Sequence, residues 1–139
     1  VLEKAKVFGE AKVSGNATIA NKAKVYGSAE VSSHANVCGY ARVYGCATVT
    51  DWAKVCDGVE VYDAASVYGF AEILGAVDVY GVAEVFGNAR VSGYSEIYGE
   101  AKVFDRARVG GYAKICGKAR IFYDAWIHND GATEGIVYK

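Results

Sequence analysis

The chain has 139 residues, with 15 basic and 16 acidic side chains and a formal net charge of −1. Its pI of about 6.1 and the confinement of its basic residues to patches argue against nucleic-acid binding. No apolar run reaches the length of a membrane span, and no signal peptide is recognisable, so we expect no membrane partner. The length fits a single domain.

A Val or Ile occupies every sixth position from Val1 to Ile127 without an insertion. A short fixed period of this kind predicts a solenoid, in which each unit buries its apolar face against its neighbours. Two residues before each aliphatic residue lies a small one, usually Ala, as in Ala5-Lys6-Val7. This alternation predicts strands about four residues long, with the small and aliphatic side chains facing inward.

Two residues after each aliphatic residue, the sequence mostly has Gly, Asn, Asp or Ser, as at Gly9, Asn21, Ser33 and Asp51. Gly, Asn and Asp tolerate positive φ, so this position predicts a corner between strands. The residue after the core aliphatic is aromatic at every eighteenth position, at Phe8, Tyr26, Tyr44, Tyr62, Tyr80 and Tyr98. Three strands and three corners therefore complete one coil, with successive coils about 4.8 Å apart.

An aliphatic residue followed four positions later by a small one, as in Val7 with Ala11, resembles the hexapeptide-repeat left-handed parallel β-helix family. The A-x-V-x-G spelling is similar to that of uncharacterised bacterial repeat proteins and of acyltransferase-like proteins. The resemblance implies an all-β fold, namely a single left-handed parallel β-helix (a triangular β-solenoid). Each coil of this helix would contain three hexads, or eighteen residues, and the chain would form about seven coils.

We expect residues 1–130 to form the β-helix and residues 131–139 to form a C-terminal tail or cap. Thr133 replaces the next aliphatic residue, and the sequence 129–131 (Asn-Asp-Gly) predicts a turn. Ile136 and Val137 then supply an apolar pair that we expect to fold over the last coil. The chain lacks Met and begins at the core residue Val1, so we expect it to be part of a longer bacterial or phage protein.

The chain contains four cysteines, Cys38, Cys46, Cys56 and Cys116. Cys38 and Cys56 lie one coil apart in one column, within Cα range of a disulfide, but side chains in register point in parallel and leave the Cβ atoms far apart. We therefore expect free thiols and a reducing compartment. Together with the lack of a signal peptide, this favours the cytoplasm.

Two columns of outward aromatic residues are the candidate interaction surface. The first contains Phe8, Tyr26, Tyr44, Tyr62, Tyr80 and Tyr98, and the second contains Tyr68, Phe86, Phe104 and Phe122. Aromatic residues also suit strands and stack on one another, so a purely structural role is the alternative. Exposed aromatic strips are unusual on a monomer, however. We therefore expect a homo-oligomer formed by lateral or end-to-end packing, with a protein or glycan ligand on the aromatic face as a further partner.

The charges are banded along the axis. Residues 58–100 contain seven acidic residues against Arg90, whereas residues 101–122 contain six basic residues against Asp105. A solvated face with screened charges is one interpretation. The other is that an acidic band on one rod contacts a basic band on another in a staggered lateral arrangement.

We therefore predict a non-catalytic, rigid β-solenoid that serves as a scaffold or as a binding or self-assembly module. The alternative, implied by the resemblance, is an acyltransferase-like hexapeptide-repeat enzyme with its active site at a subunit interface. Such enzymes use a His as general base or metal ligand, and the two histidines here, His34 and His128, are separated by five coils. They cannot meet within one chain, so His34 alone is the best candidate for a base, and we expect no metal and no cofactor.

Overall fold

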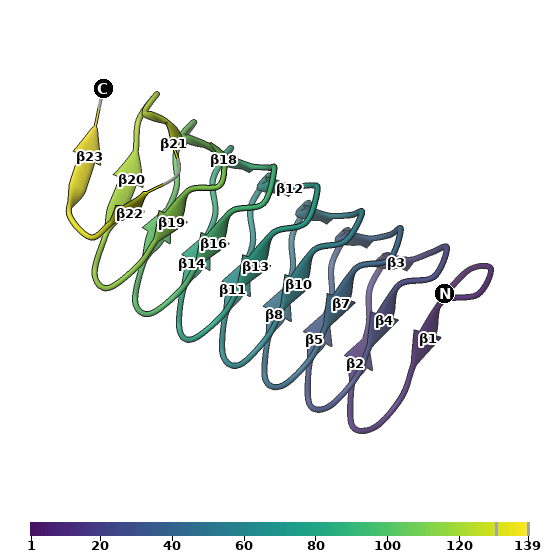
Figure 1. The fold of residues 1–139 in the computed structure, drawn as a ribbon. Coiled ribbons are helices and arrows are strands. Elements are labelled where there is room, and N and C mark those ends of the chain that lie inside the picture. The colour runs from purple at the N-terminus through teal and green to yellow at the C-terminus, as the bar shows by residue number, and fades with distance from the viewer. Residues whose placement is uncertain (130, 139) are drawn as a thin grey trace.

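The structure, a computed structural model, describes residues 1–129 and 131–138 as an all-β parallel solenoid with three sheets along its length (Figure 1). Sheet one contains β1 (Lys6–Val7), β4 (Lys24–Val25), β7 (Arg42–Val43), β10 (Glu60–Val61), β13 (Asp78–Val79), β16 (Glu96–Ile97), β19 (Lys114–Ile115) and β22 (Ala132–Thr133). Sheet two contains β2 (Lys12–Val13), β5 (Glu30–Val31), β8 (Thr48–Val49), β11 (Ser66–Val67), β14 (Glu84–Val85), β17 (Lys102–Val103), β20 (Arg120–Phe122) and β23 (Ile136–Tyr138). Sheet three contains β3 (Thr18–Ile19), β6 (Asn36–Val37), β9 (Lys54–Val55), β12 (Glu72–Ile73), β15 (Arg90–Val91), β18 (Arg108–Gly111) and β21 (Trp126–Asn129).

Each strand pairs in parallel with the strand three positions later in the chain, so equivalent residues of adjacent coils lie side by side. Val61, for example, is in register with Val43 on one side and with Val79 on the other. This register confirms the prediction that three hexads, or eighteen residues, form one coil. Because the register repeats in every coil, each outward position forms a straight column along the rod.

Most strands are regular over only two residues, which is shorter than the predicted four. The hydrogen bonding to the next coil extends further, from Lys6 N–H to the Ala23 carbonyl and from Phe8 N–H to the Val25 carbonyl. The next bond, from Glu10 N–H to the Gly27 carbonyl, already belongs to the corner. A corner every six residues ends the extended geometry before a longer strand can form.

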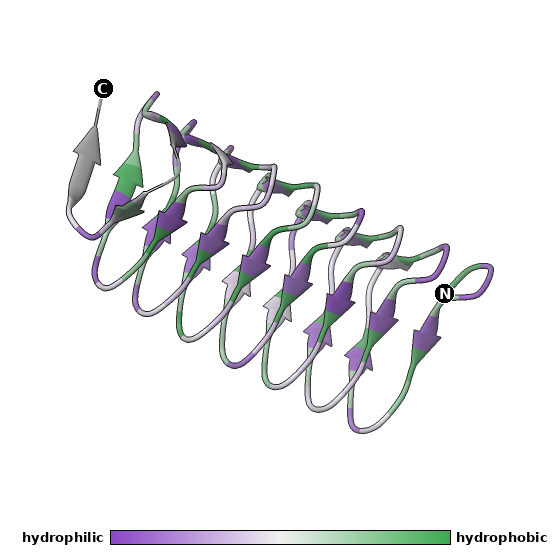
Figure 2. Cartoon of the chain, viewed as in Figure 1, coloured by the Kyte–Doolittle hydropathy of each residue, from purple (hydrophilic) through white to green (hydrophobic). Residues whose placement is uncertain are grey.

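The core consists of the predicted inward positions. From Ile19 to Ile121 the aliphatic residues of the frame are almost fully buried, as are the small residues that alternate with them. Ser95 replaces an alanine in this core, and its hydroxyl donates to the Ser92 carbonyl over 2.9 Å. Figure 2 shows the resulting pattern, in which short strands are divided between a hydrophilic and a hydrophobic residue.

The backbone has positive φ at every predicted corner from Gly9 to Gly117, and also at Glu3 and Tyr123, which extend the same position of the repeat to both ends. At Gly93 (φ 78°), an added Cβ would lie 2.6 Å from the Gly111 carbonyl oxygen of the next coil, so a side chain there would require the corner to move. Asp or Asn occupies five of the other corners, and its side chain gains a hydrogen bond in return. Asp51 Oδ2, for example, accepts the Gly69 N–H over 3.0 Å.

The expectation of free thiols is wrong for one cysteine pair, because Cys38 and Cys56 form a disulfide across adjacent coils. Their Cα atoms are 4.5 Å apart, close enough that the side chains need only rotate toward each other to bond. Cys46 and Cys116 are free, the first exposed and the second buried. The prediction of a cytoplasmic location therefore loses part of its basis.

Beyond Asn129, the chain adds a further rung to two of the sheets. Thr133 pairs with Ile115 in the usual register, and the backbone of Val137 pairs with that of Ile121, two residues earlier than the repeat requires. The segment 136–138 thus lies alongside β20. Asp130, in the predicted turn, lies outside the described residues, as do the side chains of Ile136 and Val137.

Candidate functional site

The first predicted aromatic column forms a continuous ladder on sheet one. Its rings, from Phe8 to Tyr98, are stacked with centroids 4.9–5.0 Å apart and planes within 5° of parallel. The spacing follows from the strand separation, because residues in register on adjacent parallel strands carry their side chains one above the other. A ladder of this kind stabilises the rod whether or not it also binds a partner.

Several tyrosine hydroxyls of the ladders bond to carboxylates on the same sheet. Tyr44 donates to Glu60 over 2.9 Å and Tyr80 donates to Glu96 over 3.3 Å. Burial and these carboxylates raise the pKa of Tyr44, and they raise the pKa of Tyr80 to about 12. The hydroxyls are therefore protonated at neutral pH and act as donors toward the carboxylates.

The second predicted aromatic column forms a shorter ladder on sheet two. Tyr68, Phe86, Phe104 and Phe122 stack with centroids 4.8–5.2 Å apart. Tyr68 donates its hydroxyl proton to Glu84 over 2.7 Å, and Lys102 donates to the other oxygen of Glu84 over 2.7 Å. The hydrogen bonds from Lys102 and Tyr68 lower the pKa of Glu84. This end of sheet two is thus held by a linked group of side chains.

Most side chains in these two ladders are half-buried by their neighbours, and the more exposed aromatic residues lie elsewhere. Five of them immediately follow the corners, at Tyr40, Trp52, Phe70, Tyr94 and Tyr112, each with more than half of its surface exposed; Tyr123 at a corner and Trp126 on β21 are the others among the described side chains. These residues were not among the predicted site residues, because the two predicted columns contain only the residue after the core aliphatic. The signal was present, since Trp52 and Phe70 recur one coil apart, as do Tyr94 and Tyr112.

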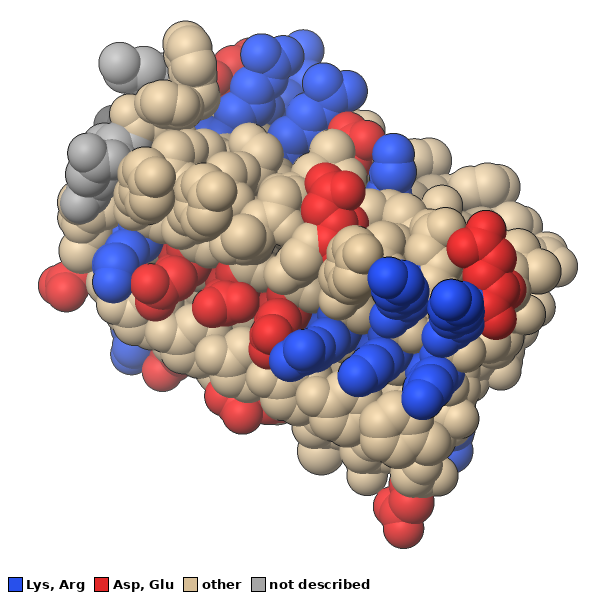
Figure 3. All heavy atoms as spheres, turned by 45° about the vertical axis from the view of Figure 1, so that its right-hand side comes forward, with Lys and Arg blue, Asp and Glu red and all other residues tan. Residues whose placement is uncertain are grey.

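The charged column of sheet one is divided into blocks, which Figure 3 shows as blue, then red, then blue along one side of the rod. In chain order the column is Lys6, Lys24, Arg42, Glu60, Asp78, Glu96 and Lys114, each in register with the next. Ion pairs form only where the blocks meet, between Arg42 and Glu60 (3.3 Å) and between Glu96 and Lys114 (3.1 Å). Like charges are therefore neighbours inside each block.

Asp78, in the middle of the acidic block, shows the effect of this arrangement. Burial, together with Glu60 and Glu96 on the adjacent strands, raises the pKa of its carboxyl group. Within the described part of the chain, the side chains of Lys6, Lys24 and Asp78 form no ion pair. Sheet three differs, because Glu72 lies between two bases and pairs with Lys54 (3.6 Å) and Arg90 (3.4 Å).

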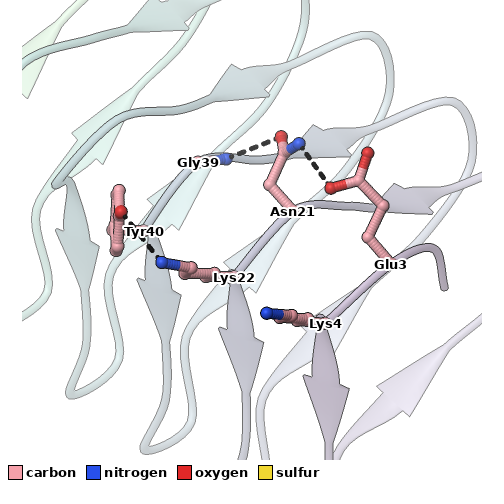
Figure 4. Close-up of a pocket in the computed structure, with 6 residues that line it drawn as sticks. All are labelled: Glu3, Lys4, Asn21, Lys22, Gly39 and Tyr40. Atoms are coloured by element: carbon pink, nitrogen blue, oxygen red, sulfur yellow. Dashed lines mark hydrogen bonds between the residues drawn. The ribbon is translucent and has the colours of Figure 1, made fainter.

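A shallow hollow of about 640 Å³ lies near the N-terminal end, at the corner between sheets three and one (Figure 4). Asn21 spans it, with its amide donating to Glu3 over 2.9 Å and its carbonyl accepting the Gly39 N–H over 3.3 Å. Lys22 donates to the Tyr40 hydroxyl and lies over the Tyr40 ring. These polar side chains bond to one another across adjacent coils and order the corner.

The candidate base His34 lies on an exposed corner, where its ring stacks on Trp52 at 3.9 Å. Its Nε2 is 3.1 Å from the Asn16 amide nitrogen. His128 is on β21, so the two histidines are on different coils far along the rod, as expected from the repeat. Among the described residues, no cluster of His, Cys, Asp and Glu has the geometry to hold a metal ion. The same residues include no helix that could cross a membrane.

The chain matches no protein-family model and no curated protein sequence.

Proposed function

We propose that this protein is a non-catalytic scaffold of the hexapeptide-repeat left-handed β-helix kind, and that it assembles by pairing sheet one with sheet one of a second, antiparallel copy. The observation that carries this proposal is the block arrangement of charge on sheet one. Three bases are followed by three acids, and a column of this kind is complementary to itself when reversed. An interface between two copies related by a two-fold axis requires such self-complementarity.

The pairs follow from the order of the column. In the antiparallel arrangement, Lys6 faces the partner's Glu96, Lys24 faces the partner's Asp78 and Arg42 faces the partner's Glu60. The two-fold axis generates each pair twice. A parallel arrangement in register would instead place like charges opposite one another. Lys24 and Asp78 gain the most from the antiparallel arrangement, because each forms no ion pair within its own described chain.

The aromatic ladder covers the same part of the rod as the paired charges. Its six rings, from Phe8 to Tyr98, lie on the six strands that carry the three bases and the three acids. The interface would thus combine an apolar strip with a charged strip, both in the same register. Sheet three lacks such a self-complementary column, because its Glu72 already has both of its basic partners within the chain.

The paired area is small. Six strands about 4.8 Å apart and about four residues wide give a face of about 29 by 13 Å, which is smaller than the face of a stable specific interface and in the range of weak, transient contacts. We therefore expect dissociation in the micromolar range or weaker, and stronger association at low ionic strength, because exposed ion pairs are screened by salt.

A charge-reversal experiment tests the proposal. Lys24→Glu and Asp78→Lys should each abolish self-association in sedimentation velocity, since each change creates two like-charge pairs per dimer. An equimolar mixture of the two variants should associate like the wild type, because every altered residue then faces an opposite charge. The double variant Lys24→Glu with Asp78→Lys should also associate with itself. Lys12→Glu, the same charge change on sheet two, is the control and should behave like the wild type.

Two results would overturn the proposal. One is that all variants sediment as the wild type does, and the other is that the mixture fails to associate while the wild type does. The predicted contact through the second ladder is tested alongside, with Phe86→Glu combined with Phe104→Glu. If this variant dissociates while the charge reversals have no effect, the contact lies on sheet two.

A further inference from the structure

Three arginines gather near the C-terminal end of the rod, where sheet three meets the corner after sheet two. Arg90 and Arg108 are in register on β15 and β18, and Trp126 follows Arg108 in the same column on β21. Arg106 comes from the adjoining corner. This group lies away from sheet one, so it remains accessible in the antiparallel dimer proposed above.

Three adjoining hollows share Arg108 as a lining residue. One of about 310 Å³ lies between Arg90, Arg108, Trp126 and His128. A second, of about 370 Å³, is lined by Arg106, Arg108, Asp124 and Trp126, and a third, also of about 370 Å³, by Asn88 and the three arginines. Together they form a strip of shallow hollows, each of which Arg108 borders.

The charge of this strip is not balanced by the residues that line it. Arg106 pairs with Asp124 over 2.8 Å, and Arg90 shares Glu72 with Lys54. The Arg108 guanidinium has neither an ion pair nor a hydrogen bond within the described part of the chain, and its neighbour in register is Arg90. Two arginines side by side on adjacent strands repel each other, and a bound anion would relieve the repulsion.

The hollow between Arg90 and His128 has Gly110 at its floor, where a side chain would crowd Ser92 and His128. The column contains Ser92, Gly110 and His128, and a Cβ added at Gly110 would lie 3.3 Å from His128 Cδ2 and 3.4 Å from Ser92 Oγ. The floor of the hollow is thus backbone and small side chains, with a hydroxyl and an imidazole at its edges. These groups supply hydrogen bonds for a polar ligand.

Trp126 supplies an apolar platform beside the arginines. It is 71% exposed, and its ring stands edge-on to His128 with the centroids 6.1 Å apart. Elsewhere in this column the outward residue is polar or charged, at Thr18, Asn36, Lys54, Glu72, Arg90 and Arg108. An exposed indole next to an unpaired guanidinium group suits a ligand with a flat face and an attached anion.

We infer that Arg90, Arg106, Arg108 and Trp126 form a binding site for an acidic saccharide, with its phosphate, sulfate or carboxylate group on the arginines and its sugar ring on Trp126. Arginine binds such oxyanions through two parallel hydrogen bonds, which gives direction as well as charge. The hollows are of the size of one or two sugar rings rather than of an extended polymer groove. Arg108 makes the central contact because it lines all three.

The test uses the fluorescence of Trp126. The chain has two tryptophans, so the variant Trp52→Phe leaves Trp126 as the only reporter. It is titrated with glucose 6-phosphate, glucuronate, inorganic phosphate, glucose and AMP. We expect saturable binding of glucose 6-phosphate and glucuronate, weaker binding of phosphate and AMP, and none of glucose. Arg108→Gln in the same background should weaken binding of the two acidic sugars about 10-fold or more.

Lys118→Gln, which removes a base at a different corner of the same end of the rod, is the matched control and should leave binding unchanged. Arg108→Gln should fold normally and melt no lower than its parent, because it removes the repulsion from Arg90, but it should lose the rise in melting temperature that saturating glucose 6-phosphate gives. The inference is overturned if no acidic sugar binds, if Arg108→Gln binds as its parent does, or if phosphate or AMP binds as tightly as glucose 6-phosphate.

Discussion

The corner aspartates hold adjacent coils together through hydrogen bonds from backbone N–H groups to their side chains, which the strands do not make. Asp57 and Asp63 accept the N–H groups of Gly75 and Gly81, and Asp105 accepts that of Tyr123, over 3.1–3.2 Å. Each of these aspartates has positive φ, which Asp and Asn tolerate better than other residues with a Cβ. An aspartate at a corner therefore offsets its backbone strain with a bond to the next coil.

Asp51→Ala tests this balance. Alanine keeps the strained φ and loses the bond from the Gly69 N–H, so we expect the free energy of unfolding to fall by about 1 to 2 kcal/mol. Asp51→Asn retains an acceptor and a tolerated φ and should change stability by less than about 0.5 kcal/mol. Urea denaturation of both variants measures the difference. Equal losses would mean that the side-chain bond does not stabilise the corner.

Adjacent residues of one strand face opposite sides, one toward the core of the rod and the next toward solvent. Val67 is fully buried, whereas the preceding residue, Ser66, faces outward and is partly exposed. Val67→Asp should lower the free energy of unfolding by at least about 3 kcal/mol, because it buries an unpaired charge. Ser66→Asp introduces the same group one position away and should cost less than about 1 kcal/mol. If both variants unfold at the same urea concentration, the assignment of inward and outward positions is wrong.

Adjacent strands differ in how they use their charges. On β14 and β17, Glu84 and Lys102 attract each other within the chain. On β10, β13 and β16, three carboxylates are stacked in register. The effects on pKa have opposite signs, since the pKa of Glu84 is lowered and the pKa of Asp78 is raised. The first arrangement stabilises the monomer, and the second destabilises it, a cost that the bases of the second copy would offset in the proposed dimer.

These opposite signs predict opposite pH dependence of stability at concentrations below the dissociation constant of the proposed dimer. Because the pKa of Asp78 is raised in the folded state, ionisation of this carboxyl group destabilises the fold. The destabilisation is absent below the unfolded-state pKa and develops as the pH rises through the folded-state pKa. Asp78→Asn should therefore stabilise the monomer at pH 7 by a few tenths to about 1 kcal/mol, and have no effect below about pH 3.

Glu84→Gln should do the reverse. Ionised Glu84 contributes to the stability of the folded state. This contribution is fully present above the unfolded-state pKa of Glu84 and is lost as the pH falls through its lowered folded-state pKa. The substitution should destabilise the protein at pH 7 and become neutral in acid. Thermal melts of both variants from pH 2 to pH 8 measure these effects. A stabilising effect of Glu84→Gln at pH 7 would contradict the pairing with Lys102.

The molecule as a whole behaves as a stack in which every coil contacts only its neighbours. The core residues are interchangeable in kind, so the fold depends on their spacing more than on any one of them. Deleting Tyr62 through Val67 should therefore leave the protein folded, because every later residue keeps its inward or outward direction. Deleting only Tyr62 through Ser66 should abolish the cooperative melt, since the deletion breaks the six-residue frame.

Far-ultraviolet circular dichroism and thermal melts distinguish these two deletions. The six-residue deletion also moves Tyr68 into the column of Tyr44, so the two aromatic ladders would join on one face. A cooperative melt of the five-residue deletion would show that the coils can slip past one another, against the fixed register of the sheets.

The coil of this protein can be worked out by counting along the chain. A six-residue repeat fixes which side chains face inward and where the corners lie, and the aromatic residue at every eighteenth position fixes three strands per coil. The same count predicted both ladders, because residues in register on parallel strands must stack. These features depend only on position in the repeat.

Contacts between different columns could be established only from the folded chain. Arg106 from a corner lines a hollow together with Arg108 from a strand, and aromatic residues just after the corners, such as Phe70, are more than half exposed. Within one column, the folded chain also showed that Cys38 and Cys56 turn toward each other and bond. Column position predicts neighbours along the rod but not contacts around a corner or side-chain rotation. Those depend on the angle at which the chain turns and on how neighbouring side chains, such as those of Ser92 and His128 beside Gly110, pack together.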